Sequence, residues 1–235
     1  MSVTNVKGQA RRGRPPQTEQ EADRVRATIV AATATVFAEH GSRGMNVALI
    51  LRTAGISRPT FYRYFANTDE PLNALLEESD AQLTGGVQAA IDSVAIDTDV
   101  AIVIAVVDAY LAWARARGAV LRPLFAELHD HYSPVSGHRV AALTQIKHAI
   151  VEKFTDMGRA APDPLDLDTL INACEYLVYR VVTDDMDRIA DGGAGDDRTA
   201  VVRATMIRLA VVVLGTTDDV RNALEIPGLF HEPTG

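Results

Sequence analysis

The stretch N-V-A-L-I-L-R-T-A-G-I-S-R-P-T-F-Y-R-Y-F, residues 46–65, reads as two short helices joined by a tight turn. Asn46 is a good N-cap for the first helix, because its side-chain oxygen can accept hydrogen bonds from the exposed amides of the first turn. Gly55 can adopt the left-handed conformation that ends a helix at no steric cost. Ser57 caps the second helix, and Pro59 is tolerated in its first turn, where amides have no intrahelical partner. The pattern predicts a helix-turn-helix.

The second of these helices, residues 58–64, has one apolar and one polar side. Phe61 and Phe65 are four residues apart and share the face that we expect to point inward. The outward side is rich in Arg, Thr and Tyr, which can bond phosphates and reach base edges in a major groove. Its residues are Arg58, Thr60, Tyr62, Arg63 and Tyr64. The alternative is an ordinary pair of surface helices, since helix-turn-helix patterns are loose.

From about Arg24 to Leu76 the chain resembles the N-terminal domain of TetR-family (tetracycline-repressor-like) transcriptional regulators, most densely in A-G-I-S-R-P-T-F-Y-R-Y-F, residues 54–65. The resemblance implies that the start of the recognition helix reads bases, and that Tyr62, Tyr64 and the amino end of the supporting helix approach the DNA backbone. The candidate DNA-binding residues are therefore Asn46, Val47, Ser57, Arg58, Pro59, Thr60, Tyr62, Arg63 and Tyr64.

Two residues depart from the pattern of that family. Leu51 stands where a small residue is usual, so the packing of the supporting helix is expected to shift slightly. Thr68 stands where a lysine often reaches a phosphate, so one charged contact with DNA is expected to be missing.

The remaining sequence shows helical periodicity and no convincing strand, which predicts an all-α fold. We expect a disordered basic arm over residues 1–20, a three-helix DNA-binding domain over 21–68 and a larger helical regulatory and dimerisation domain over 69–225. Thr68 is expected to cap a long helix that joins the two domains. The expected helices outside residues 46–65 are 21–40, 69–93, 99–117, 119–131, 135–157, 167–189 and 198–214.

Charge is distributed unevenly along the chain. Of 23 basic and 31 acidic residues, ten basic and four acidic residues lie in residues 1–68, a net charge of +6. Residues 69–235 hold the other 13 basic and 27 acidic residues, a net charge of −14. A basic head on an acidic body suits a protein that presents only its head to a polyanion such as double-stranded DNA.

The amino-terminal arm contains Arg12-Gly13-Arg14-Pro15, which resembles the core of an AT-hook. In that motif two arginines flank a glycine thin enough to lie in a narrow minor groove, so Arg12 and Arg14 are candidate DNA contacts. The alternative is a solvated basic tail that adds only non-specific attraction. The arm has no apolar segment typical of a secretory signal, and the longest apolar run, 100–107, is too short to span a bilayer. With one cysteine, Cys174, we expect a cytoplasmic protein.

Motifs of catalysis are missing from the sequence, which contains no H-E-x-x-H, G-x-S-x-G, P-loop or C-x-x-C pattern. His129 and His131 are two residues apart and would point to different sides of a helix, which argues against a metal site. We therefore expect neither a cofactor nor a metal, and an α-helical enzyme is disfavoured.

Aromatic residues gather in the acidic body. Ordinary core packing explains any one of them, but together they could line a mostly apolar cavity with a few polar handles, as small-molecule sites do. The family resemblance implies such a cavity. Few basic residues lie in these helices, which favours a neutral or cationic effector over a strongly anionic one. The candidate ligand-binding residues are Tyr110, Trp113, Phe125, His129, Tyr132, Ile146, Ile150, Phe154, Cys174 and Tyr176.

Two apolar stripes with 3–4 residue spacing lie on the last two long helices. A pair of such helices from each of two chains would form a four-helix bundle, which predicts a homodimer. The alternative is that the stripes pack only within their own chain. The candidate interface residues are Leu170, Leu177, Val178 and Val181 on one helix, and Val202, Met206, Leu209 and Val213 on the other.

These observations and the resemblance together favour a transcriptional repressor that binds operator DNA as a homodimer and is released by a small, largely apolar effector. A DNA-organising protein without an effector, which binds through its basic arm, is the alternative. The operator, the regulated genes, the effector and the choice between repressor and activator stay open at this stage.

Overall fold

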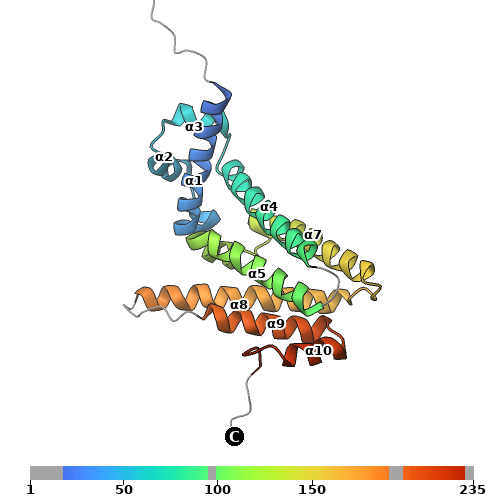
Figure 1. Cartoon of the computed structure of the whole chain (residues 1–235). Helices are drawn as coiled ribbons and strands as arrows, with labels where there is room; N and C mark the ends of the chain where they lie inside the picture. Colours follow the sequence, from blue (N-terminus) through green and yellow to red (C-terminus); the bar gives the residue numbers. More distant parts are fainter. Residues whose placement is uncertain (1–17, 95–98, 191–197, 231–235) are drawn as a thin grey trace, which may run out of the picture.

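The computed structural model describes residues 18–94, 99–190 and 198–230, and every regular element within these ranges is helical (Figure 1). This confirms the all-α prediction. Arg12 and Arg14 lie outside the described residues. The helices are α1 (Glu19–Gly44), α2 (Val47–Ala54), α3 (Arg58–Tyr64), α4 (Asp69–Ser93), α5 (Asp99–Arg117), α6 (Leu121–Ala126), α7 (Pro134–Asp156), α8 (Pro164–Ala190), α9 (Thr199–Leu214) and α10 (Thr217–Leu224), with a short 3-10 turn at Gly118–Val120.

Helices α1 to α3 form a head at one end of the molecule (Figure 1). The predicted caps are confirmed. Asn46 Oδ1 accepts from the Leu49 amide at 3.0 Å, Ser57 Oγ accepts from the Thr60 amide at 3.3 Å, and Gly55 ends α2 with φ 64°. Phe61 and Phe65 are buried in the hydrophobic core, as their spacing predicts.

The bounds of α1 run to Gly44, but Gly41 within them is not helical. With φ 65° and ψ 179°, Gly41 makes a kink that separates the expected helix 21–40 from a short helical segment after it. Just after the kink, the Ser42 amide donates a hydrogen bond of 2.8 Å to Glu127 Oε1 of the body. A side-chain acceptor from another element thus supplies the partner that the broken helical ladder lacks.

Helix α4 runs unbroken from the head into the body, and Gly85-Gly86 does not interrupt it (Figure 1). The prediction that Thr68 caps α4 through its side chain is wrong. Asn67 Oδ1 accepts from the amides of Asp69 and Glu70 at 2.9 and 3.1 Å instead. An Asn one residue earlier can reach the same exposed amides, since its side chain is one bond longer than that of Thr.

The body places α5 between α4 on one side and α9 on the other. The bounds of α5, α7, α8 and α9 agree with prediction to within three residues. The predicted helix 119–131 is wrong, because α6 ends at Ala126 and a turn follows. The sequence interpretation also missed α10, whose Thr216 and Asp219 form a reciprocal capping box. None of the helices in the described ranges has the length and apolarity needed to cross a membrane.

Candidate DNA-binding surface and effector cavity

Helix α3 presents a polar face to the outside, because the aromatic rings of Phe61 and Phe65 are buried on its opposite side. Phe61 is fully buried, and its ring packs edge-on to Tyr62 with centroids 5.5 Å apart. The side chain of Tyr62 is 48% exposed. The exposed predicted residues are Asn46, Ser57, Arg58, Pro59, Tyr62 and Arg63, whereas Val47, Thr60 and Tyr64 are half-buried.

Two of the half-buried residues already contribute to the structure of the head. The Thr60 hydroxyl is 2.8 Å from Ser57 Oγ within the cap of α3. Tyr64 packs against the head core. Arg58, by contrast, stands exposed at the first position of α3, where a long cationic side chain can extend into a groove. Arg58 is thus the side chain of this face best placed for base contacts.

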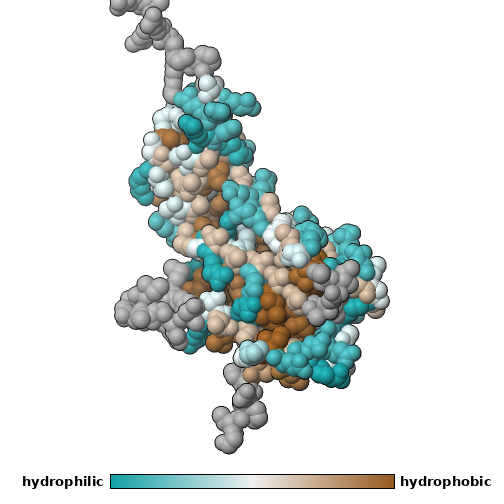
Figure 2. Space-filling model, in the orientation of Figure 1, coloured by the Kyte–Doolittle hydropathy of each residue, from teal (hydrophilic) through white to brown (hydrophobic). Residues whose placement is uncertain are grey.

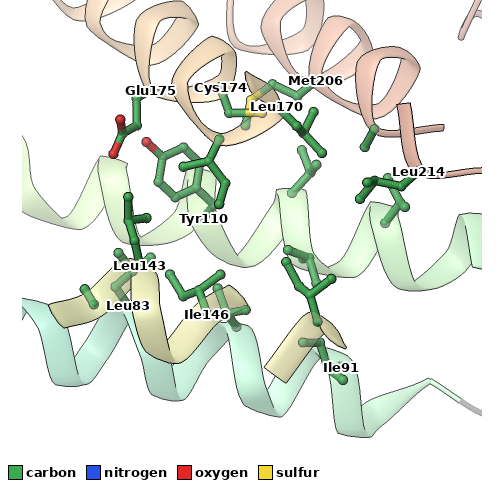
Figure 3. A pocket seen from close by; sticks show the side chains of 18 of the residues that line it. Leu83, Ile91, Tyr110, Leu143, Ile146, Leu170, Cys174, Glu175, Met206 and Leu214 are labelled. Carbon is green, nitrogen blue, oxygen red and sulfur yellow. The ribbon is translucent and has the colours of Figure 1, made fainter. Parts of the chain in front are cut away.

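A cavity of about 200 Å³ lies within the body, between α4, α5, α7, α8 and α9. Its walls are mostly aliphatic (Figure 3). The structure brings seven of the ten predicted ligand-binding residues to this cavity: Tyr110, Trp113, Phe125, Ile146, Ile150, Phe154 and Cys174.

Hydrophobic residues also reach the surface of the body near the place where α5, α9 and α10 meet (Figure 2).

Three predicted ligand-binding residues do not line the cavity. His129 and Tyr132 lie in the turn after α6, where Tyr132 is 93% exposed, because α6 ends earlier than predicted. Tyr176 is 59% exposed. It follows Cys174 by two residues, which turns it to nearly the opposite side of α8.

The sequence interpretation missed most of the wall that α4 contributes, together with two hydrogen-bonded pairs of side chains. Leu83, Val87 and Ile91 line the cavity from α4. His138 Nδ1 lies 2.7 Å from Asp80 Oδ2. The Arg139 guanidinium donates to both carboxylate oxygens of Glu175, at 3.0 Å from Nε and 2.7 Å from the terminal nitrogen. The helical spacing of the α4 leucines signals a buried face, but no sequence pattern signals pairs between residues 36 or 58 positions apart.

Burial changes the acidity of three groups in the cavity. It raises the pKa of Asp80, although the hydrogen bond from His138 partly opposes this effect. It raises the pKa of the Cys174 thiol to about 12, helped by the nearby charge of Glu175, so this thiol stays protonated and unreactive at neutral pH. Burial raises the pKa of Tyr110 well above its ordinary value, with a further contribution from Glu175.

Glu127 joins the body to the head at the turn after α6. Its Oε1 accepts from the Ser42 amide, and its Oε2 accepts from the Ser133 hydroxyl at 2.6 Å. A Cβ atom on Gly41 would lie only 2.8 Å from the same Oε1, so glycine permits this close approach. Phe125 and Leu128, on either side of Glu127, line the cavity. One short segment therefore contacts both the cavity and the end of α1.

The predicted dimer stripes face mainly into their own chain. Leu170, Val178, Val202 and Met206 are buried, while Leu177, Val181, Leu209 and Val213 are half-buried. Each stripe lies on an apolar side of its helix, and the four buried residues are covered within their own chain. Other apolar residues of these helices are exposed, namely Leu165 and Tyr176 on α8 and Val201 and Val212 on α9.

Sequence comparison matches the head to a known family. Residues 29–75 match the model described as bacterial regulatory proteins, tetR family. An HTH-type transcriptional regulator of Mycobacterium tuberculosis is 29% identical over 178 residues, covering 75% of this chain and 73% of that relative. A regulator of the same description from Mycobacterium bovis matches equally well. The family and these relatives are transcriptional regulators and not enzymes.

Solved structures share the fold over most of the chain. The fatty acid degradation regulator FadR from Bacillus halodurans has a TM-score of 0.65 and 20% identity, and the match covers 82% of this chain and 96% of that one. The regulator FadR from Bacillus subtilis, solved in complex with stearoyl-CoA, has a TM-score of 0.59 and 18% identity over 81% of this chain and 98% of that one.

Proposed function

We propose that this chain, a transcriptional regulator with a tetR-family DNA-binding domain, is a homodimeric repressor that leaves its operator when a largely apolar effector enters the body cavity. The observation that carries the proposal is that one helix, α4, serves both regions. Leu72 and Leu76 of α4 are buried near the head, and Leu76, Leu83 and Val87 line the cavity. A ligand that moves the cavity end of α4 therefore moves the base of the head.

The DNA-binding part of the proposal places α3 in a major groove. Arg58 reads base edges, Tyr62 bonds the phosphate backbone, and Asn46 at the start of α2 approaches a neighbouring phosphate. The positive net charge of residues 1–68 attracts DNA, while the negative body disfavours other orientations.

The effector part rests on the composition of the cavity walls. Leucine, isoleucine and valine from five helices favour a ligand with a substantial hydrocarbon part. The stearoyl-CoA bound to the Bacillus subtilis protein contains such a part, and the shared fold supports an effector with a hydrocarbon chain here. To shift the protein from nearly all bound to nearly all free, the effector must prefer the DNA-incompetent state by about 5 kcal/mol.

For the dimer we propose the outer faces of α8 and α9. Val201 and Val212 are about three helical turns apart and share one side of α9, and Leu165 and Tyr176 do the same on α8. Exposed apolar residues in such rows are typical of surfaces that a partner covers. A symmetric pair would present two heads about 34–36 Å apart, or a multiple of this distance, as adjacent major grooves require.

The test is operator binding with purified protein and DNA from upstream of its own gene. We expect tight binding to an inverted repeat by two protomers, weak binding to scrambled DNA, and release by those lipophilic compounds that also change the fluorescence of Trp113. Equal affinity for both DNAs, with no effect of any compound, would instead favour the DNA-organising alternative.

The dimer surface has its own test. Val201→Glu combined with Val212→Glu should convert the dimer to soluble monomers in analytical ultracentrifugation and weaken operator binding strongly. Val140→Glu is a matched control, since Val140 is also an exposed valine on a body helix but lies on α7. Dimers that survive the α9 changes and dissociate with Val140→Glu would move the interface to α7.

A further inference from the structure

The hydroxyl of Tyr110 is an unsatisfied polar group in the cavity wall. Its oxygen is shielded from solvent and has no hydrogen-bond partner among the residues that the structure describes. The ring stacks on Trp113 with centroids 5.6 Å apart, which holds it in place. Figure 3 shows the hydroxyl end pointing toward Glu175. A buried hydroxyl without a partner is unfavourable, and a partner that arrives with a ligand would remove this penalty.

The polar groups nearest to Tyr110 already have partners. The Trp113 indole donates to the Ser79 carbonyl at 3.0 Å, so it is not free to orient a ligand. The Glu175 carboxylate accepts three hydrogen bonds from Arg139. The Cys174 thiol is at most a weak donor. Specificity in this part of the cavity therefore depends on Tyr110.

The surrounding charges decide what Tyr110 can bind. The hydroxyl keeps its proton at neutral pH, because burial and the Glu175 carboxylate both raise its pKa, so it can donate a hydrogen bond. A ligand carboxylate placed there would approach Glu175, and the Arg139 guanidinium that could neutralise it is already engaged. An uncharged oxygen meets no such repulsion and loses less hydration on entering an apolar site.

We infer that the effector carries an uncharged oxygen, a carbonyl or a hydroxyl, within a hydrocarbon framework, and that Tyr110 selects it by donating a hydrogen bond from Oη. This inference rests on the proposed function and names the chemistry of its effector. The competing arrangement is an anionic head group near Lys153 and Arg159, which line the cavity toward the end of α7. Arg139 and Lys153 are about 21 Å apart along that helix, so Tyr110 would have no role in holding such a head group.

The test compares three probes of similar length with the full-length protein: 2-undecanone, 1-undecene and undecanoate. Trp113 is the single tryptophan and stacks on Tyr110, so its fluorescence reports binding at this position. We expect 2-undecanone to bind about tenfold more tightly than either other probe, the ratio that one net hydrogen bond provides. Tyr110→Phe should abolish the advantage over 1-undecene. Tyr132→Phe, a hydroxyl deletion at a 93% exposed position in the turn after α6, should leave all three affinities unchanged.

A second measurement needs no ligand. Because the Tyr110 hydroxyl is unsatisfied, Tyr110→Phe without ligand should have a Tm equal to or above that of the wild type. A lower Tm would mean that the hydroxyl has a partner within the protein and would overturn the inference. Undecanoate binding more tightly than the ketone, or ketone affinity unaffected by Tyr110→Phe, would overturn it as well. In these two outcomes the probes still bind, so the proposed function is retained. If no probe binds, both the inference and the proposed function are wrong.

Discussion

The head and the body of this molecule are packed in opposite ways. In the head, Phe37, Ile50 and Phe61 are completely buried, and the caps of α2 and α3 satisfy the exposed amides locally. In the body, Ile102, Val103 and Val106 on the central helix border the cavity and are only half-buried. A filled core keeps the geometry of α3 constant, which reading DNA requires. Unfilled space in the body costs stability, because the side chains around it lose van der Waals contacts, but it leaves room for a ligand.

The largest loss of stability should come from removing a buried side chain from the closely packed core of the head. Phe61→Ala removes a fully buried ring from the head and should destabilise the protein by about 3–5 kcal/mol, measured by urea unfolding. Ile150→Ala, at the half-buried cavity wall, should cost less than about 2 kcal/mol, since part of its surface already faces empty space. Equal losses at the two positions would remove the contrast between head and body.

A second set of substitutions tests whether the exposed face of α3 in the head binds DNA. Arg58→Ala should weaken operator binding by about 1–3 kcal/mol and relax base preference, as the loss of a bidentate base contact does. Tyr62→Phe should weaken binding to all sequences alike, because it removes only a backbone contact. The readout is competition binding with a set of single-base operator variants. Unchanged preference in Arg58→Ala would mean that another face reads the bases.

A single substitution can remove the hydrogen bonds by which Glu127 connects the body to the head. Glu127→Ala leaves the Ser42 amide and the Ser133 hydroxyl without their acceptor and should cost about 1–2 kcal/mol of stability. We also expect effectors to bind normally while releasing DNA less effectively, because the link between cavity wall and α1 is lost. Glu225→Ala, at an exposed position after α10, is the control. Normal release by Glu127→Ala would leave α4 as the sole route of coupling.

The smallest effect concerns pH and the partly buried Asp80. Its pKa in the folded protein lies above the ordinary value of 3.8, so the folded state holds this proton more tightly than the unfolded state. The contribution of Asp80 to stability therefore falls as pH rises through the interval just above 3.8. Unfolding measured across this interval should show that decline in the wild type and a flatter dependence in Asp80→Asn. Asp92→Asn, an exposed carboxylate on the same helix, should behave like the wild type.

The head could be predicted almost completely from the sequence, because its signals are local. The caps at Asn46 and Ser57, the left-handed Gly55 and the four-residue spacing of Phe61 and Phe65 each involve neighbours within one or two helical turns. Such contacts depend on backbone geometry that a short segment already has. The cap by Asn67, one residue away from the predicted Thr68, shows how small the remaining error is.

The body was predictable only in part. Each of its helices forms from signals within a short segment, but the helices that pack against it come from distant parts of the sequence. Spacing showed that α8 and α9 each have an apolar side, yet only the packed structure decides that Met206 faces the cavity while Val212 faces outward. The same holds for the partner of Arg139, for the acceptor of the Ser42 amide and for the isolation of the Tyr110 hydroxyl. Sequence alone determined where most of the helices form, except for α10 and the early end of α6, and which end carries the positive charge. Tertiary packing decided which side chains share a cavity, because contacts between distant segments depend on how whole helices are placed.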